Sequence, residues 1–97
     1  MQFGIQLPHL GPLADGEGSV RVARLAEKLG FDSVWVGDHV VYPATLVDRF
    51  GESCFEAVTM LTWVGASTTT IRLGTGVLIA PYRNPLVLAK QIAIRSD

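Results

Sequence analysis

Apolar and polar residues alternate at the start of the chain, over residues 2–7. Phe3, Ile5 and Leu7 would share one face of an extended segment, because successive side chains of a strand point to opposite faces. Pro8 ends the pattern, since proline has no N–H to donate to a neighbouring strand. This stretch therefore predicts a β-strand followed by a loop.

Helical spacing of apolar residues follows over residues 20–29, with charged residues between them. Gly30 is placed to cap this helix at its C-terminus, because glycine accepts the left-handed backbone that such caps use. Asp15 and Ser19 are alternative caps for its N-terminus, and the pattern does not choose between them. A first strand–helix unit is thus complete at Gly30.

A second unit follows, with a long connection. Residues 34–36 form a short apolar run that we expect to be buried on both faces, as strands of parallel sheets are. Helical spacing returns over residues 54–68, and the threonines at 68–70 end it because β-branched residues are poor helix formers. The connection, residues 40–53, lacks a regular period, and loops of this length are typical of binding segments.

The third unit has the same order. Residues 71–79 predict a strand, and residues 80–83 predict a loop. Asn84 and Pro85 are typical of a helix cap and first helical residue, and the helix is expected to run to about residue 94. Strand, loop and helix repeated in register predict an α/β protein with parallel strands.

The length of 97 residues limits this architecture. A (β/α)8 barrel takes about 250 residues, so the chain would hold about three of its eight units and could not close a barrel. Three parallel strands would leave two sheet edges and one face uncovered. We therefore expect one domain over residues 1–97, an incomplete barrel that is completed by further units or by a second copy of the chain.

Composition narrows the class of protein. Apolar residues make up 48% and charged residues 18% of the chain, and the net charge is -1, which predicts a globular protein without general affinity for nucleic acid or anionic membranes. Cys54 is the single cysteine, so an internal disulfide is excluded and a reducing cytoplasm is expected. The start of the chain resembles no signal peptide, and no apolar run is long enough for a membrane span.

Candidate chemistry lies after the strands, because parallel sheets and barrels bind ligands at the carboxyl ends of their strands. Asp38 and His39 follow the second strand, and a carboxylate beside an imidazole suits proton transfer near neutral pH. The alternative is that Asp38 caps the loop and His39 is solvated.

His9 is expected to be an exposed loop histidine. No spacing typical of metal ligands is present, so we expect no metal site.

Gly74 and Gly76 lie within the third predicted strand. They are not a phosphate-binding fingerprint, because an apolar strand follows them and not a helix. Glycine in a strand marks either a bulge where a ligand approaches the backbone or a site that must leave room for a large neighbour such as Trp35. Both interpretations stay open.

Four segments together resemble the bacterial luciferase-like family, and most of all its branch of coenzyme F420-dependent oxidoreductases. They are residues 3–8, 29–39, 71–78 and 83–91. The resemblance covers nearly the whole chain. It implies part of a TIM-barrel domain that binds F420, or alternatively FMN, at the carboxyl ends of its strands, with a small organic molecule as substrate.

The resemblance also implies roles for particular residues. His39 would donate or accept the proton, and Asp38 would orient it and contact the cofactor or substrate. A non-prolyl cis peptide, mapped to Gly76–Val77, would form a bulge behind the cofactor ring, and Leu78 continues that surface.

The leading hypothesis is therefore a fragment of an oxidoreductase whose intact parent transfers hydride between F420 and an organic substrate. An FMN-dependent monooxygenase and a non-catalytic remnant stabilised by oligomerisation are the alternatives. The later strands and phosphate-binding residues of the family are missing from this chain, so we expect the isolated chain to be inactive.

Overall fold

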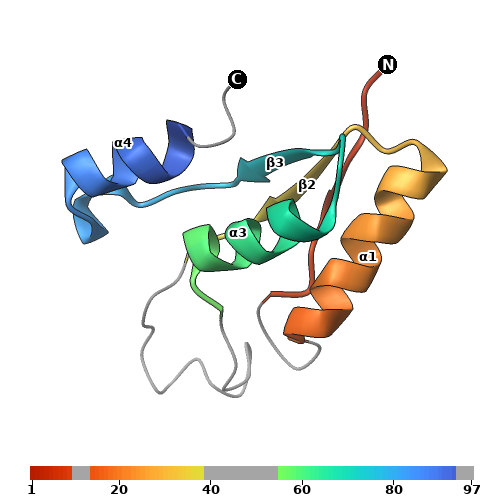
Figure 1. Cartoon of the computed structure of the whole chain (residues 1–97), viewed down its shortest axis with the longest axis horizontal. Helices are drawn as coiled ribbons and strands as arrows, with labels where there is room; N and C mark the ends of the chain where they lie inside the picture. The colour runs from red at the N-terminus through yellow and green to blue at the C-terminus, as the bar shows by residue number, and fades with distance from the viewer. Residues whose placement is uncertain (10–13, 39–54, 94–97) are drawn as a thin grey trace.

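The computed structural model describes residues 1–9, 14–38 and 55–93. Strands and helices alternate along it, as the sequence predicts (Figure 1). In chain order the elements are β1 (Gly4–Gln6), α1 (Gly16–Leu29), β2 (Ser33–Val36), α3 (Ala57–Ser67), β3 (Arg72–Thr75), the 3-10 helix η2 (Ala80–Tyr82) and α4 (Pro85–Ala93). His39 and Cys54 lie outside the described residues.

The three strands form one parallel sheet in the order β1-β2-β3. Ile5, Val34 and Leu73 lie side by side across it, so the apolar positions of the strands fall on one face. Among the described residues, β1 and β3 have no strand on their outer edges. The expected incomplete parallel barrel with two open edges is confirmed.

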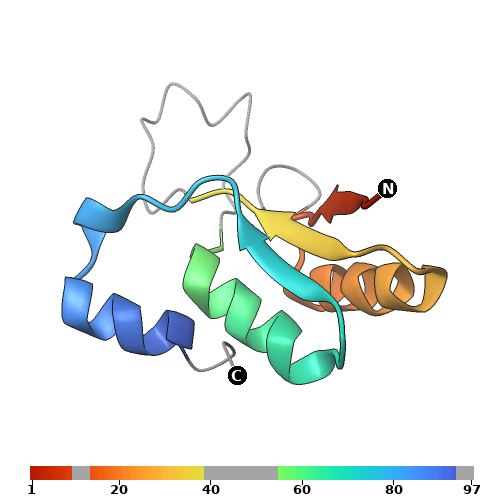
Figure 2. The ribbon, with the colours of Figure 1, turned by 90° about the horizontal axis from the view of Figure 1, so that it is seen from above.

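Helices α1 and α3 cover one face of the sheet, and Figure 2 shows them as a layer beneath the strands. The core lies between these layers, because amphipathic helices bury their apolar stripe against the sheet. Its buried residues are Leu7, Val20, Ala23, Ala26, Val34, Val36, Ala57, Met60, Val64 and Ile71. Helix α4 lies at the side of this core, beyond α3 (Figure 2).

The opposite face of the sheet carries Trp35, whose side chain is 41% exposed. The prediction that the second strand is buried on both faces was therefore wrong: Val34 and Val36 are buried by the helices, but no described element covers the other face. A Cβ at Gly4 would lie 2.5 Å from the indole Nε1, and a Cβ at Gly74 would lie 2.6 Å from Cε3. Gly74 thus leaves room for Trp35, one of the two interpretations that the sequence left open.

The helix ends follow the predicted chemistry with one shift. α1 begins at Gly16, earlier than the apolar spacing indicated, and Asp15 occupies the N-cap position without a side-chain cap hydrogen bond. Gly30 ends α1 with a φ of 90°, the left-handed conformation expected there. Asn84 caps α4, because its Oδ1 accepts a hydrogen bond from the backbone N–H of Leu86 at 2.9 Å.

The third strand is shorter than predicted. β3 ends at Thr75, and the predicted continuation to Ile79 is wrong. Gly76 still donates its N–H to the carbonyl of Val36 at 2.8 Å, but Ile79 donates its N–H to the carboxylate of Asp38 and not to a neighbouring strand. A side chain therefore replaces the sheet as hydrogen-bond partner at the carboxyl end of this segment.

None of the described helices has the length and apolarity needed to cross a membrane.

Candidate functional site

The carboxyl ends of the strands meet at one rim of the sheet. Leu7 donates its N–H to the carbonyl of Trp35 at 2.9 Å, and Gly76 does the same to Val36 at 2.8 Å. These bonds carry the parallel pairing beyond β1 and β3. Ligands of parallel α/β folds bind at this rim.

His9, after β1, is buried and only 3% exposed. Its Nε2 accepts a hydrogen bond from the backbone N–H of Gly37 at 2.8 Å, and its Nδ1 lies 3.0 Å from the carbonyl oxygen of Leu7. The ring therefore accepts at Nε2 and donates at Nδ1. The expectation of an exposed histidine was wrong, because this ring satisfies buried backbone groups of two strand ends.

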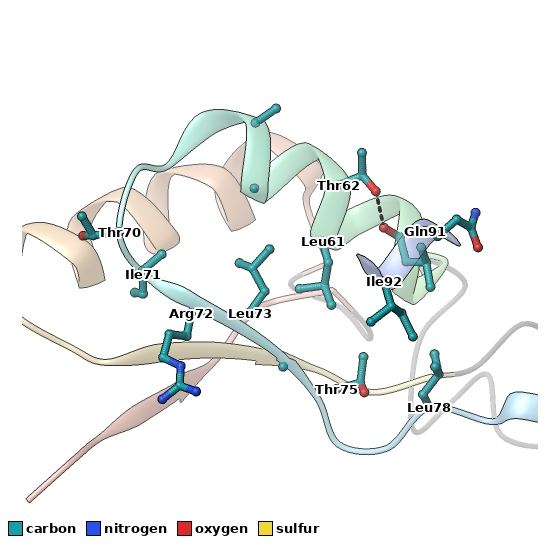
Figure 3. Close-up of a pocket in the computed structure, with 14 residues that line it drawn as sticks. Leu61, Thr62, Thr70, Ile71, Arg72, Leu73, Thr75, Leu78, Gln91 and Ile92 are labelled. Atoms are coloured by element: carbon teal, nitrogen blue, oxygen red, sulfur yellow. Dashed lines mark hydrogen bonds between the residues drawn. The ribbon is translucent and has the colours of Figure 1, made fainter. Parts of the chain in front are cut away.

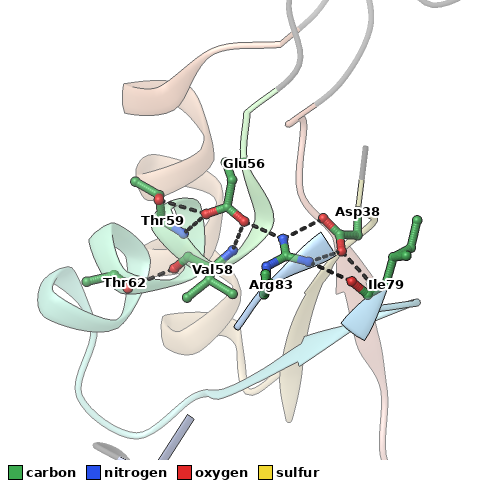
Figure 4. A network of polar contacts seen from close by, with 7 residues as sticks. All are labelled: Asp38, Glu56, Val58, Thr59, Thr62, Ile79 and Arg83. Atoms are coloured by element: carbon green, nitrogen blue, oxygen red, sulfur yellow. Dashed lines mark hydrogen bonds and ion pairs between the residues drawn. The ribbon is translucent and has the colours of Figure 1, made fainter. Parts of the chain in front are cut away.

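Asp38, after β2, has a side chain with 0% exposure. Its Oδ2 lies 2.5 Å from Nη1 of Arg83, and its Oδ1 lies 2.8 Å from Nη2, so the pair is bidentate (Figure 4). Oδ2 also accepts the N–H of Ile79 at 2.7 Å. The carboxylate joins the end of β2 to the segment after β3.

Glu56 joins the same guanidinium from the start of α3. Its Oε2 accepts a hydrogen bond from Nη2 of Arg83, while its Oε1 accepts the backbone N–H of Thr59 at 2.8 Å and caps the helix. Burial raises the pKa of Glu56, but the hydrogen bonds from Arg83 and from the start of α3 outweigh it and lower the pKa below its ordinary value. The hydrogen bonds to Asp38 and then to Glu56 raise the pKa of Arg83, so the guanidinium stays charged.

The sequence analysis did not identify this Arg83 network. A usable signal was nevertheless present, because Arg83 lies just before the N-terminus of α4, where the helix dipole disfavours a cation. A cation at that position gains from a nearby carboxylate, and Asp38 follows a buried strand where an unpaired charge would be costly.

The residues predicted to bind the cofactor lie at the same rim. The peptide bond between Gly76 and Val77 is cis, at the position that the resemblance implies. Val77 is 71% exposed and presents apolar surface, and Gly76 is exposed beside it. The structure brings Asp38 to this segment through Ile79. His39 lies outside the described residues.

A cavity of about 670 Å³ lies elsewhere, between α3, β3 and α4 (Figure 3). Leu61, Leu73 and Ile92 contribute apolar surface to it. Of the described site residues, only Leu78 lines the cavity; Asp38, Gly76 and Val77 do not. The cavity therefore lies between β3 and the helices, and it reaches the predicted cofactor residues only at Leu78.

Known proteins with similar sequences include F420-dependent enzymes. The chain is 44% identical over 69 residues to the F420-dependent glucose-6-phosphate dehydrogenase of Kineococcus radiotolerans, covering 70% of this chain and 19% of the relative. It is 30% identical over 96 residues to a luciferase-like monooxygenase of Escherichia coli K12, covering 92% of this chain and 27% of the relative. The chain thus spans less than a third of each relative.

Solved structures agree with the fold. An F420-dependent secondary alcohol dehydrogenase in complex with an F420-acetone adduct superposes with a TM-score of 0.74 and 26% identity, covering 95% of this chain and 26% of that one. Monooxygenase RslO1 from Streptomyces bottropensis gives 0.72 and 31% identity, covering 97% and 29%. The family model for luciferase-like monooxygenases matches residues 1–94. This chain therefore belongs to the luciferase-like monooxygenase family and carries part of its barrel.

Proposed function

We propose that the intact protein that carries this chain is an oxidoreductase that transfers hydride between coenzyme F420 and a small organic substrate. The observation that carries the proposal is the meeting of Asp38 with the segment after β3, where the N–H of Ile79 lies 2.7 Å from Oδ2. The strand ends thus form one rim at the edge where this fold class binds ligands. The similarity to F420-dependent enzymes supports the choice of cofactor.

The rim fits a flat cofactor ring. The exposed backbone of Gly76 and the 71% exposed side chain of Val77 offer an apolar surface that a ring would cover. Burial of such surface favours binding in proportion to its area. Asp38, Gly76, Val77 and Leu78 are the described residues that we assign to the cofactor.

Proton transfer is assigned to His39, the residue after the buried Asp38. Bound F420 supplies hydride chemistry. For an alcohol substrate, His39 would accept the hydroxyl proton while the carbon that bears the hydroxyl gives its hydride to F420, so the substrate would lose two electrons and become a carbonyl compound. The orientation of His39 by Asp38 stays a prediction, because the described contacts of Asp38 are with Arg83 and Ile79.

An FMN-dependent monooxygenase is the second candidate. The observation that favours it is the likeness to the monooxygenase RslO1, which has the higher identity of the two structures, 31% against 26%. The described part of the rim does not distinguish a flavin from a deazaflavin ring, because glycine backbone and valine surface would support either.

The uncovered face of the sheet has to be buried in the intact protein. Trp35 is 41% exposed there, and both outer strand edges are open within the described residues. Further barrel units or a second copy of the chain would cover it. Sedimentation of the 97-residue chain tests this, since a stable monomer at high concentration would contradict the need for a cover.

The cofactor proposal is tested by titrating the intact protein with F420 and, separately, with FMN, and by following F420 reduction with a panel of alcohols. We expect binding to F420 to be at least about tenfold tighter than binding to FMN. Flavin retained through purification, together with no binding of F420, would overturn the proposal in favour of the monooxygenase.

A pair of variants locates the site. Val77→Glu places a charge on the surface assigned to the ring, so we expect F420 binding to be lost. Val87→Glu is the matched control, because Val87 is 54% exposed on α4, outside the rim. Equal losses in both variants would exclude the rim as the binding surface.

A further inference from the structure

We propose that Arg83 is a positioning residue for the cofactor: with Asp38 it fixes the backbone of residues 76–79, the surface against which the ring lies. This inference rests on the proposed function and goes beyond it, because it assigns a role to a residue that does not itself touch the cofactor.

The ion pair holds both backbone polar groups of Ile79. The N–H of Ile79 donates to Oδ2 of Asp38 at 2.7 Å, and its carbonyl oxygen accepts a hydrogen bond from Nη1 of Arg83 at 3.1 Å. The same Nη1 lies 2.5 Å from Oδ2 (Figure 4). One peptide segment is thus bonded to both members of a charge pair, which leaves it little freedom to rotate.

A fixed support is needed because this segment has left the sheet. β3 ends at Thr75, and the last strand-like bond is that of Gly76 to Val36. Val77 is 71% exposed, so neighbouring side chains do little to hold it. Among the described residues, the Asp38–Arg83 pair therefore holds the C-terminal end of this segment, at Ile79, while the bond of Gly76 holds its start.

Arg83 is suited to this task by its surroundings and its shape. Its side chain is 13% exposed and the Asp38 side chain 0%, so water competes little for the pair. A guanidinium presents parallel N–H groups that match both carboxylate oxygens, and its remaining donors reach the carbonyl of Ile79 and the carboxylate of Glu56. A lysine offers one point charge and cannot make all these bonds.

The test compares Arg83→Lys, Arg83→Met and a control, Arg21→Met, in the intact protein. Arg21 pairs with Asp15 at the surface, where the side chains are 70% and 56% exposed, so its loss should leave the rim unchanged. Two quantities are measured: the dissociation constant for F420, and the hydrogen-exchange rate of the Ile79 amide relative to that of Ala23 in α1.

We expect Arg83→Met to raise the dissociation constant and the exchange rate of Ile79 by about tenfold or more, Arg83→Lys to be intermediate, and Arg21→Met to match the wild type. Exchange at Ala23 should stay as in the wild type, which separates loss of positioning from loss of the fold. If Arg83→Met does not fold, the same two quantities are compared between Arg83→Lys and the wild type.

Faster exchange at Ile79 with an unchanged dissociation constant would overturn the proposal, because Arg83 would then stabilise the loop without serving the cofactor. If the wild type binds neither F420 nor FMN, the proposed function fails on its own. The exchange rate of Ile79 then decides whether Arg83 fixes this segment: a rate unchanged in both Arg83 variants contradicts the positioning role.

Discussion

Carboxylates bind backbone N–H groups at both ends of the sheet, but their surroundings differ. At the amino ends, Glu27 of α1 accepts the N–H groups of Thr70 at 2.6 Å and Ile71 at 2.8 Å, just before β3. At the carboxyl ends, Asp38 accepts one N–H and also pairs with a guanidinium. In the described part of the chain, Glu27 forms no ion pair.

The two ends differ in what the loss of a carboxylate leaves behind. Glu27 fixes the loop between α3 and β3 with neutral donors at the surface, where little is lost if the loop opens. The network at the other end places two carboxylates on one partly buried cation, an arrangement that leaves costly unpaired charge when any member is removed. In barrels the carboxyl ends of the strands carry the chemistry, so the more tightly held carboxylate lies at the end where the cofactor is proposed to bind.

Removal of Asp38 should have the largest effect. Asp38→Ala leaves Arg83 without its bidentate partner, so we expect the free energy of unfolding to fall by about 3 kcal/mol, measured by urea denaturation. Asp15→Ala is the control, because the Asp15 pair with Arg21 is exposed and should contribute at most about 0.5 kcal/mol. Similar losses in the two variants would remove the distinction between a partly buried and a surface pair.

Removal of His9 should have the next largest effect at the carboxyl end. His9→Ala leaves the N–H of Gly37 and the carbonyl of Leu7 without their side-chain partner, and we expect a loss of about 2 kcal/mol. His9→Gln keeps an acceptor near the position of Nε2 and should recover part of the loss. If both variants are equally destabilised, the hydrogen bond to Gly37 is not the cause.

Gly74 lies in β3 between the two ends of the sheet, and its substitution tests how closely the sheet packs against Trp35. Gly74→Ala would place a Cβ 2.6 Å from Cε3 of Trp35, so we expect a loss of about 1 to 2 kcal/mol from overpacking. In Gly18→Ala the nearest contact is the flexible side chain of Asp15, and alanine favours the helix, so the change should be neutral or stabilising. Melting temperatures that move in the same direction would contradict the close packing of the indole.

Glu27→Gln should have the smallest effect, and the effect should depend on pH. Hydrogen bonds from the backbone of Ile71 and then of Thr70 lower the pKa of Glu27 below its ordinary value of 4.5. A lowered pKa in the folded state means that the carboxylate stabilises the fold above pH 4.5 and that this contribution is lost as the pH falls through the folded pKa.

The urea midpoint of Glu27→Gln should therefore lie below that of the wild type at neutral pH and approach it in acid. Glu17→Gln, at the exposed first turn of α1, is the comparison and should depend less on pH, because only the helix dipole favours the Glu17 carboxylate. A midpoint difference that is the same at pH 7 and pH 3 would show that ionisation of Glu27 is not involved.

Local patterns predicted most of the fold. The alternation around Ile5, the cap at Gly30 and the Asn84–Pro85 pair each depend on a few neighbouring residues, and the structure has each of them where the sequence placed it. The end of β3 could not be read in this way. Ile79, which the sequence placed in the strand, bonds to Asp38, 41 residues away in the chain.

The candidate site was predicted only in part. Asp38 was identified because it follows the second predicted strand, and Gly76 because it is a glycine within the third predicted strand and matches the family resemblance, but the partners of Asp38 were not identified. Arg83 is 45 residues from Asp38 and 27 from Glu56, and nothing in the local sequence fixes which charges meet across such separations. Likewise, His9 looks like any loop histidine until the fold brings the backbone of Gly37 to its ring.

The indole of Trp35 in β2 restricts which residues can stand next to it in β1 and β3. It occupies the space that side chains at Gly4 and Gly74 would need, so a change at one of the three positions alters what the other two can accommodate. A smaller residue at position 35 would permit larger ones on both flanks, and a larger residue on either flank would demand a smaller one between them. Across natural descendants of this sequence, the three positions should change in concert.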